Sequence, residues 1–281
     1  MKPTILTIAG SDSCGGAGIQ GDLKSIAANG GYGASVVTAV TAQNTVGVSG
    51  VDEIRPGMIE AQIDAVFDDL EIAAVKTGML GSSRTIDVVA KGLQTHRPRR
   101  VVCDPVMISK AGARLLAEEA VDSLVRELLP LADLITPNAE EAAVLTGIRP
   151  RNRDEAVEAG RRILSQGARA VLVKGGHLDD DPATDVLVTP EGTRFFTAAW
   201  IDTPHTHGTG CTYSAAIATH LGRGLDLESA IELSKQFLTN AIRGGLAIGS
   251  GAGPTDPFYF LKDDGEPPWA DGSAAAEARE P

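Results

Sequence analysis

Short apolar runs rich in Val, Ile and Ala alternate along this chain with longer amphipathic stretches. Because most of these runs lack polar alternation, they are typical of strands buried on both faces, and they predict a mostly parallel sheet with helices on either side. The strands are predicted at Ile5–Ala9, Ala34–Ala39, Ala73–Lys76, Val101–Asp104, Leu134–Thr136 and Ala170–Lys174. The helices between them are predicted near Gly18–Asn29, Pro56–Asp69, Ser83–Thr95, Ala117–Leu129, Ala139–Thr146 and Arg153–Gln166. The alternation indicates a three-layer α/β/α fold.

The pattern changes in the second half of the chain. A turn at Pro190-Glu191-Gly192 predicts a hairpin, and two long helical stretches follow it. The hairpin strands are predicted at Asp185–Thr189 and Arg194–Ala198, and the helices at about Cys211–Arg223 and Leu227–Ile248. No repeat or linker divides the sequence, so we expect one domain over residues 1–261 of the 281. Residues 262–281 are rich in Pro, Gly, Ala and acidic residues, and we expect a flexible tail.

The overall charge and composition exclude several classes of function. A net charge of −12 argues against a nucleic-acid partner, because binding to a phosphate backbone needs a basic surface. No apolar run reaches the roughly 18–20 residues of a membrane-spanning helix, and the N-terminus lacks a signal-peptide pattern, so we expect a cytoplasmic protein without a membrane partner. The cysteines, Cys14, Cys103 and Cys211, are far apart, and no histidines have HxxxH or HExxH spacing. The sequence therefore predicts neither a disulfide framework nor a zinc site.

The stretch Gly16-Ala17-Gly18-Ile19-Gln20-Gly21 matches the pattern GxGxxG. In a dinucleotide-binding fold this pattern follows the first strand directly, and an acidic residue for the ribose comes about 20 positions later. Here the loop Ser11–Gly15 intervenes, and no carboxylate stands near the end of the second strand. A dinucleotide site is therefore disfavoured. The alternatives are a turn that caps a helix and a substrate-enclosing loop whose small residues let the backbone approach a ligand closely.

A second glycine-rich stretch, His207-Gly208-Thr209-Gly210-Cys211, precedes a predicted helix. Two glycines that flank a threonine let successive backbone N–H groups converge, and a helix N-terminus adds positive potential. This combination suits a transferring phosphoryl group, although an ordinary glycine-rich loop before a buried helix is the alternative. Cys211 at such a helix start is predicted to have a lowered pKa, unless it is simply a small buried hydrophobic residue.

Polar side chains follow several predicted strands, at the edge where open α/β sheets bind ligands. Asp104 is a candidate ligand of Mg²⁺, directly or through water. Glu141, three residues after Asn138, is half of a helix-capping pair, part of a metal–water site, or both. Lys174 is a candidate for neutralising phosphate charge, or a solvated lysine at a strand end. Gln43 offers a donor and an acceptor that suit an aminopyrimidine edge better than sugar hydroxyls, or it caps a loop.

Taken in order, these motifs resemble the ribokinase superfamily, and within it the hydroxymethylpyrimidine/phosphomethylpyrimidine kinase branch of thiamine biosynthesis. The resemblance runs from about residue 4 to residue 260. Several of the motifs are weak individually, and their combination in this order is specific. The matching stretches are Ile8–Asp12, Gly15–Lys24, Thr38–Thr45, Lys76–Leu80, Asp104–Met107, Thr136–Asn138 with Glu141, Lys174–His177 and His207–Thr212.

The resemblance implies a ribokinase-like sheet between helices, without the large separate lid of sugar kinases. It also implies ATP as co-substrate, Mg²⁺ as cofactor and a homodimer. At the substrate end it implies that Gln43 binds the ring nitrogen and amino group of the pyrimidine, and that Asp22 is a further substrate-binding residue. Apolar walls are implied from Ala17, Met79 and Val106.

The resemblance also assigns the phosphate end of the site. Asp104 and Glu141 would organise the Mg²⁺ shell, and Lys174 would contact the phosphates. The turn Gly208–Cys211, with Gly208 and Gly210, would stabilise the moving phosphoryl group. The residues that lie where family members contact ATP are Thr209, Lys174 and Lys235.

One departure from the superfamily lies in the turn itself. Sugar kinases carry an aspartate base after the glycines, whereas this chain has Cys211, which resembles the pyrimidine kinase branch and some pyridoxal kinases. A loose phosphoryl transition state depends mainly on positioning and charge stabilisation, which tolerates this change. Our hypothesis is that Cys211 accepts the alcohol proton or positions the hydroxyl group.

The main functional hypothesis is ATP-dependent phosphorylation of hydroxymethylpyrimidine and of its monophosphate, although the sequence does not separate these two steps. A pyridoxal kinase, or a kinase with both activities, is an alternative because both substrates are flat heteroaromatic alcohols. Gln43 and Met79 favour the pyrimidine. A non-catalytic sensor of thiamine precursors is a second alternative, disfavoured because the residues needed for transfer are present together.

Overall fold

The structure is a computed structural model that describes residues 2–107, 115–176, 178–179 and 183–262. This part of the chain is built on a nine-stranded sheet with the order β3-β2-β1-β4-β5-β6-β7-β8-β9. The strands β2, β1, β4, β5, β6 and β7 run parallel, whereas β3, β8 and β9 pair antiparallel at the two edges. The strands are β1 (Thr4–Ser11), β2 (Tyr32–Gln43), β3 (Val48–Glu53), β4 (Ile72–Thr77), β5 (Val101–Cys103), β6 (Leu134–Ile135), β7 (Val171–Val173), β8 (Thr184–Thr189) and β9 (Gly192–Thr197).

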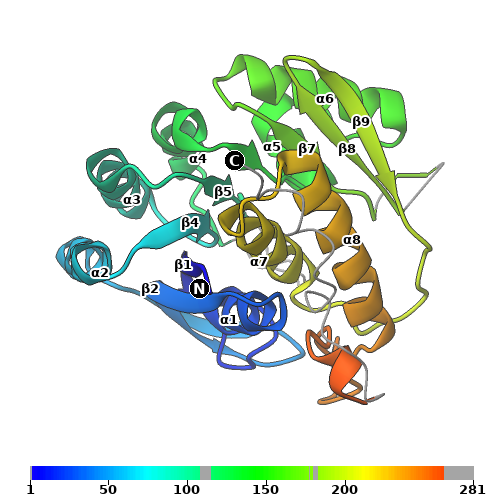
Figure 1. Cartoon of the computed structure of the whole chain (residues 1–281), viewed down its shortest axis with the longest axis horizontal. Helices are drawn as coiled ribbons and strands as arrows, with labels where there is room; N and C mark the ends of the chain where they lie inside the picture. Colours follow the sequence, from blue (N-terminus) through cyan, green and yellow to red (C-terminus); the bar gives the residue numbers. More distant parts are fainter. Residues whose placement is uncertain (1, 108–114, 177, 180–182, 263–281) are drawn as a thin grey trace, which may run out of the picture.

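Helices cover both faces of this sheet (Figure 1). They are α1 (Gly18–Ala28), α2 (Pro56–Asp69), α3 (Ser83–His96), α4 (Ala120–Ser123), α5 (Ala139–Thr146), α6 (Arg153–Ser165), α7 (Thr209–Gly222) and α8 (Leu227–Arg243). Successive residues of strand β5 pack into different apolar clusters. Val101 and Cys103 belong to an apolar cluster with residues of α2, α3 and α6, whereas Val102 belongs to a cluster with residues of α1, α7 and α8. The predicted three-layer α/β/α fold is therefore confirmed.

The sequence pattern does not predict the edge strand β3. Its residues Val48–Glu53 are largely exposed and include a glycine and two acids, so no apolar run marks them. The strand forms by antiparallel pairing with β2, which extends to Gln43, beyond its predicted end at Ala39. Pairing with a neighbour, rather than burial, thus defines this element.

Two helical segments differ from their predicted bounds. The predicted helix at Ala117–Leu129 is divided into α4, a π-helical segment η1 (Leu124–Leu128) and a 3-10 turn η2 (Leu129–Leu131). Pro130 in the last turn has no N–H for a helical hydrogen bond, which favours the end of the helix there. The helix α8 ends at Arg243 rather than near Ile248, because two glycines follow.

The parallel strands end at a common edge of the sheet. Asp12 follows β1, Asp104 follows β5, Lys174 follows β7, and Gln43 ends β2. Because the carboxyl ends of parallel strands meet at the same edge, residues far apart in the sequence come together there. This edge holds the candidate site.

In the described residues, no element forms a separate lid domain. The predicted tail lies outside these residues except for Lys262, which ends the 3-10 helix η3 (Tyr259–Lys262). Among the described helices, none is long and apolar enough to cross a membrane.

Candidate active site

The turn His207–Cys211 leads directly into α7. Gly208 is the N-cap residue of the helix and has a φ of 79°. A Cβ at this position would collide with the backbone carbonyl oxygen of Gly16, so glycine is required for both its conformation and its size. Thr209 begins the helix, and its hydroxyl donates to the carbonyl of Thr206 at 2.7 Å. The N-terminus of α7 therefore presents its backbone N–H groups from a tightly fixed turn.

A lysine and two carboxylates lie beside this turn. A Cβ added at Gly210 would lie 3.3 Å from Nζ of Lys174 and 3.6 Å from Oδ2 of Asp104. Nζ of Lys174 lies 2.8 Å from Oδ1 of Asp104 and 3.9 Å from Oε2 of Glu141. All three charged side chains are largely buried. The structure thus brings together four residues that the sequence analysis assigned to phosphate and metal.

Asp104 is an ionised carboxylate with several donors. The hydroxyls of Thr136 and Ser214 donate to its two oxygens at 3.1 Å each. Burial raises the pKa of Asp104, but the ammonium groups of Lys174 and Lys76 outweigh burial and hold this pKa below its usual value.

Glu141 forms a capping box with Asn138 at the start of α5. The Glu141 N–H donates to Oδ1 of Asn138 at 2.9 Å, and the Asn138 N–H donates to Oε2 of Glu141 at 2.8 Å. Burial raises the pKa of Glu141 to about 7, and Asp104 adds to this rise while Lys174 opposes it. Two buried carboxylates that disfavour each other's charge fit a divalent cation, and carboxylate oxygens are ligands that Mg²⁺ takes. The residues present therefore fit a magnesium shell.

The predicted lowering of the pKa of Cys211 is wrong. Burial raises the pKa of this thiol to about 12. The carboxylates of Asp22 and Asp104 add to the rise, whereas Lys76 and the N–H of Gly18 act against it. With its pKa raised in this way, Cys211 is a neutral thiol at neutral pH.

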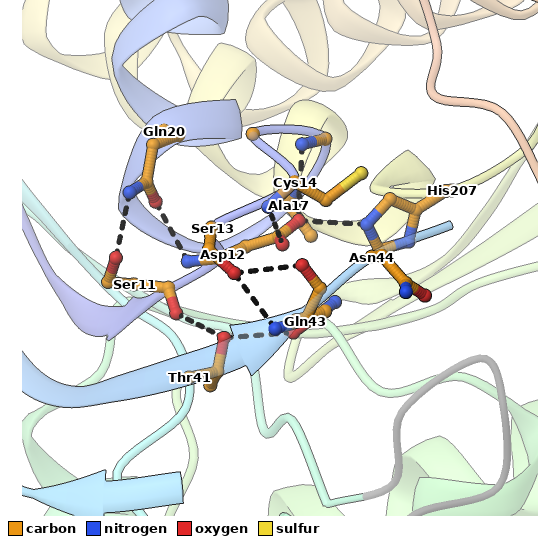
Figure 2. Close-up of polar contacts among 12 residues, drawn as sticks. Ser11, Asp12, Ser13, Cys14, Ala17, Gln20, Thr41, Gln43, Asn44 and His207 are labelled. Atoms are coloured by element: carbon orange, nitrogen blue, oxygen red, sulfur yellow. Dashed lines mark hydrogen bonds and ion pairs between the residues drawn. The ribbon is translucent and has the colours of Figure 1, made fainter. Parts of the chain in front are cut away.

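Gln43 lies beside the loop that follows β1 (Figure 2). The Ser13 hydroxyl donates to the backbone carbonyl of Gln43 at 2.8 Å and accepts from its N–H at 2.8 Å. The Thr41 hydroxyl donates to the Ser11 carbonyl at 2.8 Å and also lies 3.2 Å from Oε1 of Gln43. The loop Ser11–Ala17 thus folds against the residue predicted to recognise the pyrimidine.

The three predicted apolar walls follow different elements at the same edge. Ala17 is the N-cap residue of α1. Met79 follows β4 and is nearly buried, and a Cβ added at Gly10 would lie 3.1 Å from its Sδ. Val106 follows β5 and is partly exposed. Their contact with a substrate stays a prediction.

Two residues predicted to bind ligands have partners inside the protein. Asp22 is fully buried, with Nζ of Lys76 at 2.8 Å and the Thr7 hydroxyl at 2.6 Å. Lys235 donates to Oδ2 of Asp185 at 2.7 Å. The predicted roles of Asp22 toward substrate and of Lys235 toward ATP stay predictions.

Sequence reasoning assigned no role to Asp185 and treated Lys76 only as part of a motif. Asp185 also accepts hydrogen bonds from the Tyr213 hydroxyl at 2.8 Å and from the Gly175 N–H at 2.7 Å, so it joins β8, α7 and α8 next to Lys174. The signal for Lys76 is a charged residue inside an apolar strand pattern, which requires a buried acid as its partner. Asp185 lies near the start of the hairpin strand β8, and its neighbours in the sequence do not indicate its partners.

A family model described as phosphomethylpyrimidine kinase matches residues 12–256 of this chain. The chain belongs to this family. The hydroxymethylpyrimidine/phosphomethylpyrimidine kinase of Rhizobium meliloti (strain 1021) is 49% identical over 263 residues, which cover 92% of this chain and 98% of that protein. The thiamine biosynthesis bifunctional protein ThiED of Geobacter sulfurreducens is 47% identical over 262 residues. That alignment covers 93% of this chain and 54% of the bifunctional protein, so the chain spans about half of its length.

Solved structures of kinases share this fold. The phosphomethylpyrimidine kinase of Clostridium difficile 630 is 45% identical with a TM-score of 0.77, and the match covers 86% of this chain and 100% of that one. The pyridoxal kinase of Bacillus subtilis, solved as an ADP complex, is 38% identical with a TM-score of 0.85, and the match covers 91% and 97% of the two chains. The resemblance to the phosphomethylpyrimidine kinase family is confirmed, and with it the class of phosphotransferases.

Proposed function

We propose that this member of the phosphomethylpyrimidine kinase family transfers the γ-phosphoryl group of ATP to hydroxymethylpyrimidine, and then to its monophosphate, in thiamine biosynthesis. The observation that carries the proposal is the convergence of Lys174, Asp104 and Glu141 on the turn at the N-terminus of α7. The name of the Rhizobium meliloti relative supports the choice of substrate.

The phosphate end of the site works mainly by charge stabilisation. The backbone N–H groups of Gly208–Cys211 face the transferring phosphoryl group, and the ammonium of Lys174 neutralises its oxygens. Asp104 and Glu141 hold Mg²⁺, which when bound supplies charge neutralisation on the phosphate oxygens of ATP. ATP also contacts Thr209 and Lys235.

The substrate end holds a flat, neutral ring. The Gln43 amide binds the ring nitrogen and the amino group of the pyrimidine. Its apolar faces lie against Ala17, Met79 and Val106. Asp22, which is buried beside Lys76, is the further substrate-binding residue of this proposal.

A product assay tests this function. We expect the protein, with ATP, Mg²⁺ and hydroxymethylpyrimidine, to form ADP together with the monophosphate and then the diphosphate, resolved by anion-exchange chromatography. Accumulation of the monophosphate alone would limit the proposal to the first step. Tight binding of the pyrimidine without ADP formation would instead support a sensor.

Pyridoxal phosphorylation is the second candidate activity, favoured by the likeness to the Bacillus subtilis pyridoxal kinase. The two substrates share a CH₂OH group on a flat ring and differ in the edge that Gln43 would bind. We expect a higher kcat/KM for hydroxymethylpyrimidine than for pyridoxal. A Gln43→Leu variant should lose activity toward the pyrimidine selectively, because the buried amino group would then lack a partner.

We also propose that the enzyme is a homodimer that works in the cytoplasm, where its co-substrate ATP is made and used. Support for association comes from the β2–β3 ribbon, whose edge strand has no buried residue and whose strands expose the large hydrophobic residues Tyr32, Val40 and Val51.

A further inference from the structure

The carboxylate of Asp12 joins the loop after β1 to the turn before α7 (Figure 2). Its oxygens accept hydrogen bonds from the backbone N–H groups of Cys14 at 2.8 Å, Gly16 at 3.1 Å and Ala17 at 2.8 Å. The fourth donor is Nε2 of His207, 2.8 Å from Oδ2. One side chain therefore holds three points of the first loop and one of a turn that is 195 positions away in the sequence.

The two glycine turns also pack backbone against backbone. A Cβ at Gly208 would collide with the Gly16 carbonyl, and a Cβ at Gly16 would collide with the ring of His207. His207 is itself held at both backbone groups, since its N–H donates to the Gly253 carbonyl at 3.0 Å and its carbonyl accepts from the Thr255 N–H at 3.2 Å. The two backbones are in contact, and the hydrogen bond between the Asp12 carboxylate and the His207 imidazole joins them. The loop and the turn can therefore move apart only if this bond lengthens.

A metal ion is the alternative occupant of this cluster. Asp12, Cys14 and His207 each present one ligand atom, and these atoms lie within 4.8 Å of one another. The carboxylate argues against a cation, because its lone pairs are already used by three backbone N–H groups and the imidazole. Coordination would leave those buried donors without an acceptor. The cluster is better explained as a structural contact between the loop after β1 and the turn before α7. We call this contact, formed by Asp12 and His207, the joint.

The charge state fixes the direction of the hydrogen bond. Burial opposes the charge on Asp12, but hydrogen bonds from His207, Ala17 and Cys14 hold the pKa of Asp12 below its usual value. An ionised carboxylate only accepts hydrogen bonds, so Nε2 of the imidazole carries the proton and donates.

We propose that Asp12 and His207 are positioning residues, which fix the distance between the phosphoryl-transfer turn and the loop that encloses the substrate alcohol. For its catalytic consequence the inference rests on the proposed function. Ala17, a proposed wall of the pyrimidine site, donates to Asp12, and the phosphate-binding glycines begin at the residue after His207. The joint thus connects the part of the site that holds the substrate alcohol to the part that holds the transferring phosphoryl group.

Loss of this joint should affect transfer rather than ATP binding. Lys174 and the two carboxylates of the magnesium site are held by other contacts and stay in place. In ATP hydrolysis, water takes the place of the substrate alcohol, so this reaction does not depend on how the alcohol is positioned. The rate of ATP hydrolysis should therefore fall less than the rate of pyrimidine phosphorylation. The ratio of ADP to phosphorylated pyrimidine should therefore rise, which a loss of folded protein alone would not cause.

The test uses variants that differ in one hydrogen bond. His207→Leu removes the donor at similar volume, Asp12→Asn removes one of the two acceptor oxygens, and His207→Gln keeps an N–H near the position of Nε2. We expect the first two to lower kcat about 100-fold and to raise the ADP ratio, with the KM for ATP within about 3-fold of wild type. We expect His207→Gln to recover kcat to within about 5-fold, because it restores the charge-assisted bond.

A second histidine–aspartate pair provides the matched control. Nε2 of His96 lies 2.9 Å from Oδ1 of Asp64, between α3 and α2 and away from the site. Asp64→Asn and His96→Leu should leave kcat and the ADP ratio unchanged.

Amide hydrogen exchange gives a readout that does not depend on activity. Asp12→Asn should speed exchange at residues 207–212, and Asp64→Asn should not. Unchanged exchange there, or a His207→Leu enzyme with a wild-type kcat and ADP ratio, would overturn the inference. If the wild type phosphorylates no pyrimidine and Asp12→Asn still loosens the turn, the proposed function fails while the joint stands.

Discussion

Cys211 occupies the place in the turn where sugar kinases carry a base, and its burial decides what it can do there. With a pKa raised to about 12, the thiol stays protonated across the range from about pH 6 to 9, and a neutral thiol is too weak a base to take the alcohol proton. We expect Cys211→Ala to lower kcat by less than about 10-fold, whereas loss of a true general base costs about 100- to 10,000-fold. The pH profile of kcat should show no thiol ionisation in that range.

The comparison variant for this prediction is Cys211→Asp, which places a carboxylate where the sugar kinases have one. If Cys211→Ala lost activity and Cys211→Asp regained it, the thiol would be a proton acceptor after all. A melting temperature measured for both variants separates packing effects from chemistry, because the neighbouring Asp22 disfavours a second buried charge.

Single residues at strand ends could be predicted from the sequence, and their partners could not. Asp104 and Lys174 stand where any parallel sheet presents its carboxyl edge, so their position follows from the strand pattern. The pKa of Cys211 depends on burial and on the charges of Lys76, Asp22 and Asp104, which no local pattern contains. The bond of Asp12 to His207 depends in the same way on contact across the whole chain.

At the scale of elements, the capping box of α5 links stability to the metal site. We expect Asn138→Ala to lower the free energy of unfolding by about 1 kcal/mol, because it removes the acceptor of the Glu141 N–H. The backbone N–H of residue 138, which donates to the Glu141 carboxylate, is kept, but without the cap the first turn of α5 that carries both groups should be less rigid. The Mg²⁺ concentration for half-maximal activity should then rise about 10-fold.

The matched control is Asn152→Ala at the start of α6. Asn152 accepts from the Glu155 N–H at 2.9 Å, as Asn138 accepts from Glu141, and Glu155 is partly exposed and outside the site. Urea unfolding should give a similar loss of stability for both variants, with the Mg²⁺ requirement raised only in Asn138→Ala. If both variants needed the same Mg²⁺ concentration, the cap at Asn138 would have no effect on the metal site.

Elements were predictable where burial marks them. The inner strands and the amphipathic helices have apolar patterns because both faces of the sheet are covered. β3 forms by pairing alone, and η1 continues α4 with a different hydrogen-bond spacing over an unchanged apolar pattern. The hydropathy pattern indicates neither the pairing of an exposed strand nor the hydrogen-bond spacing within a helix.

At the scale of the whole molecule, the β2–β3 ribbon is one of the two edges of the sheet in the described residues, and its edge strand β3 is largely exposed. In an isolated chain, the unpaired edge of β3 and the exposed Val51 would favour association with another strand. We expect sedimentation velocity to give twice the mass of the chain. Val51→Glu should convert this species to a monomer, because a carboxylate buried at an interface without a partner is strongly disfavoured. Val144→Glu, an equally exposed change on α5, should leave the dimer intact. A dimer that survives Val51→Glu would move the interface away from this ribbon, and a wild-type monomer would exclude the homodimer.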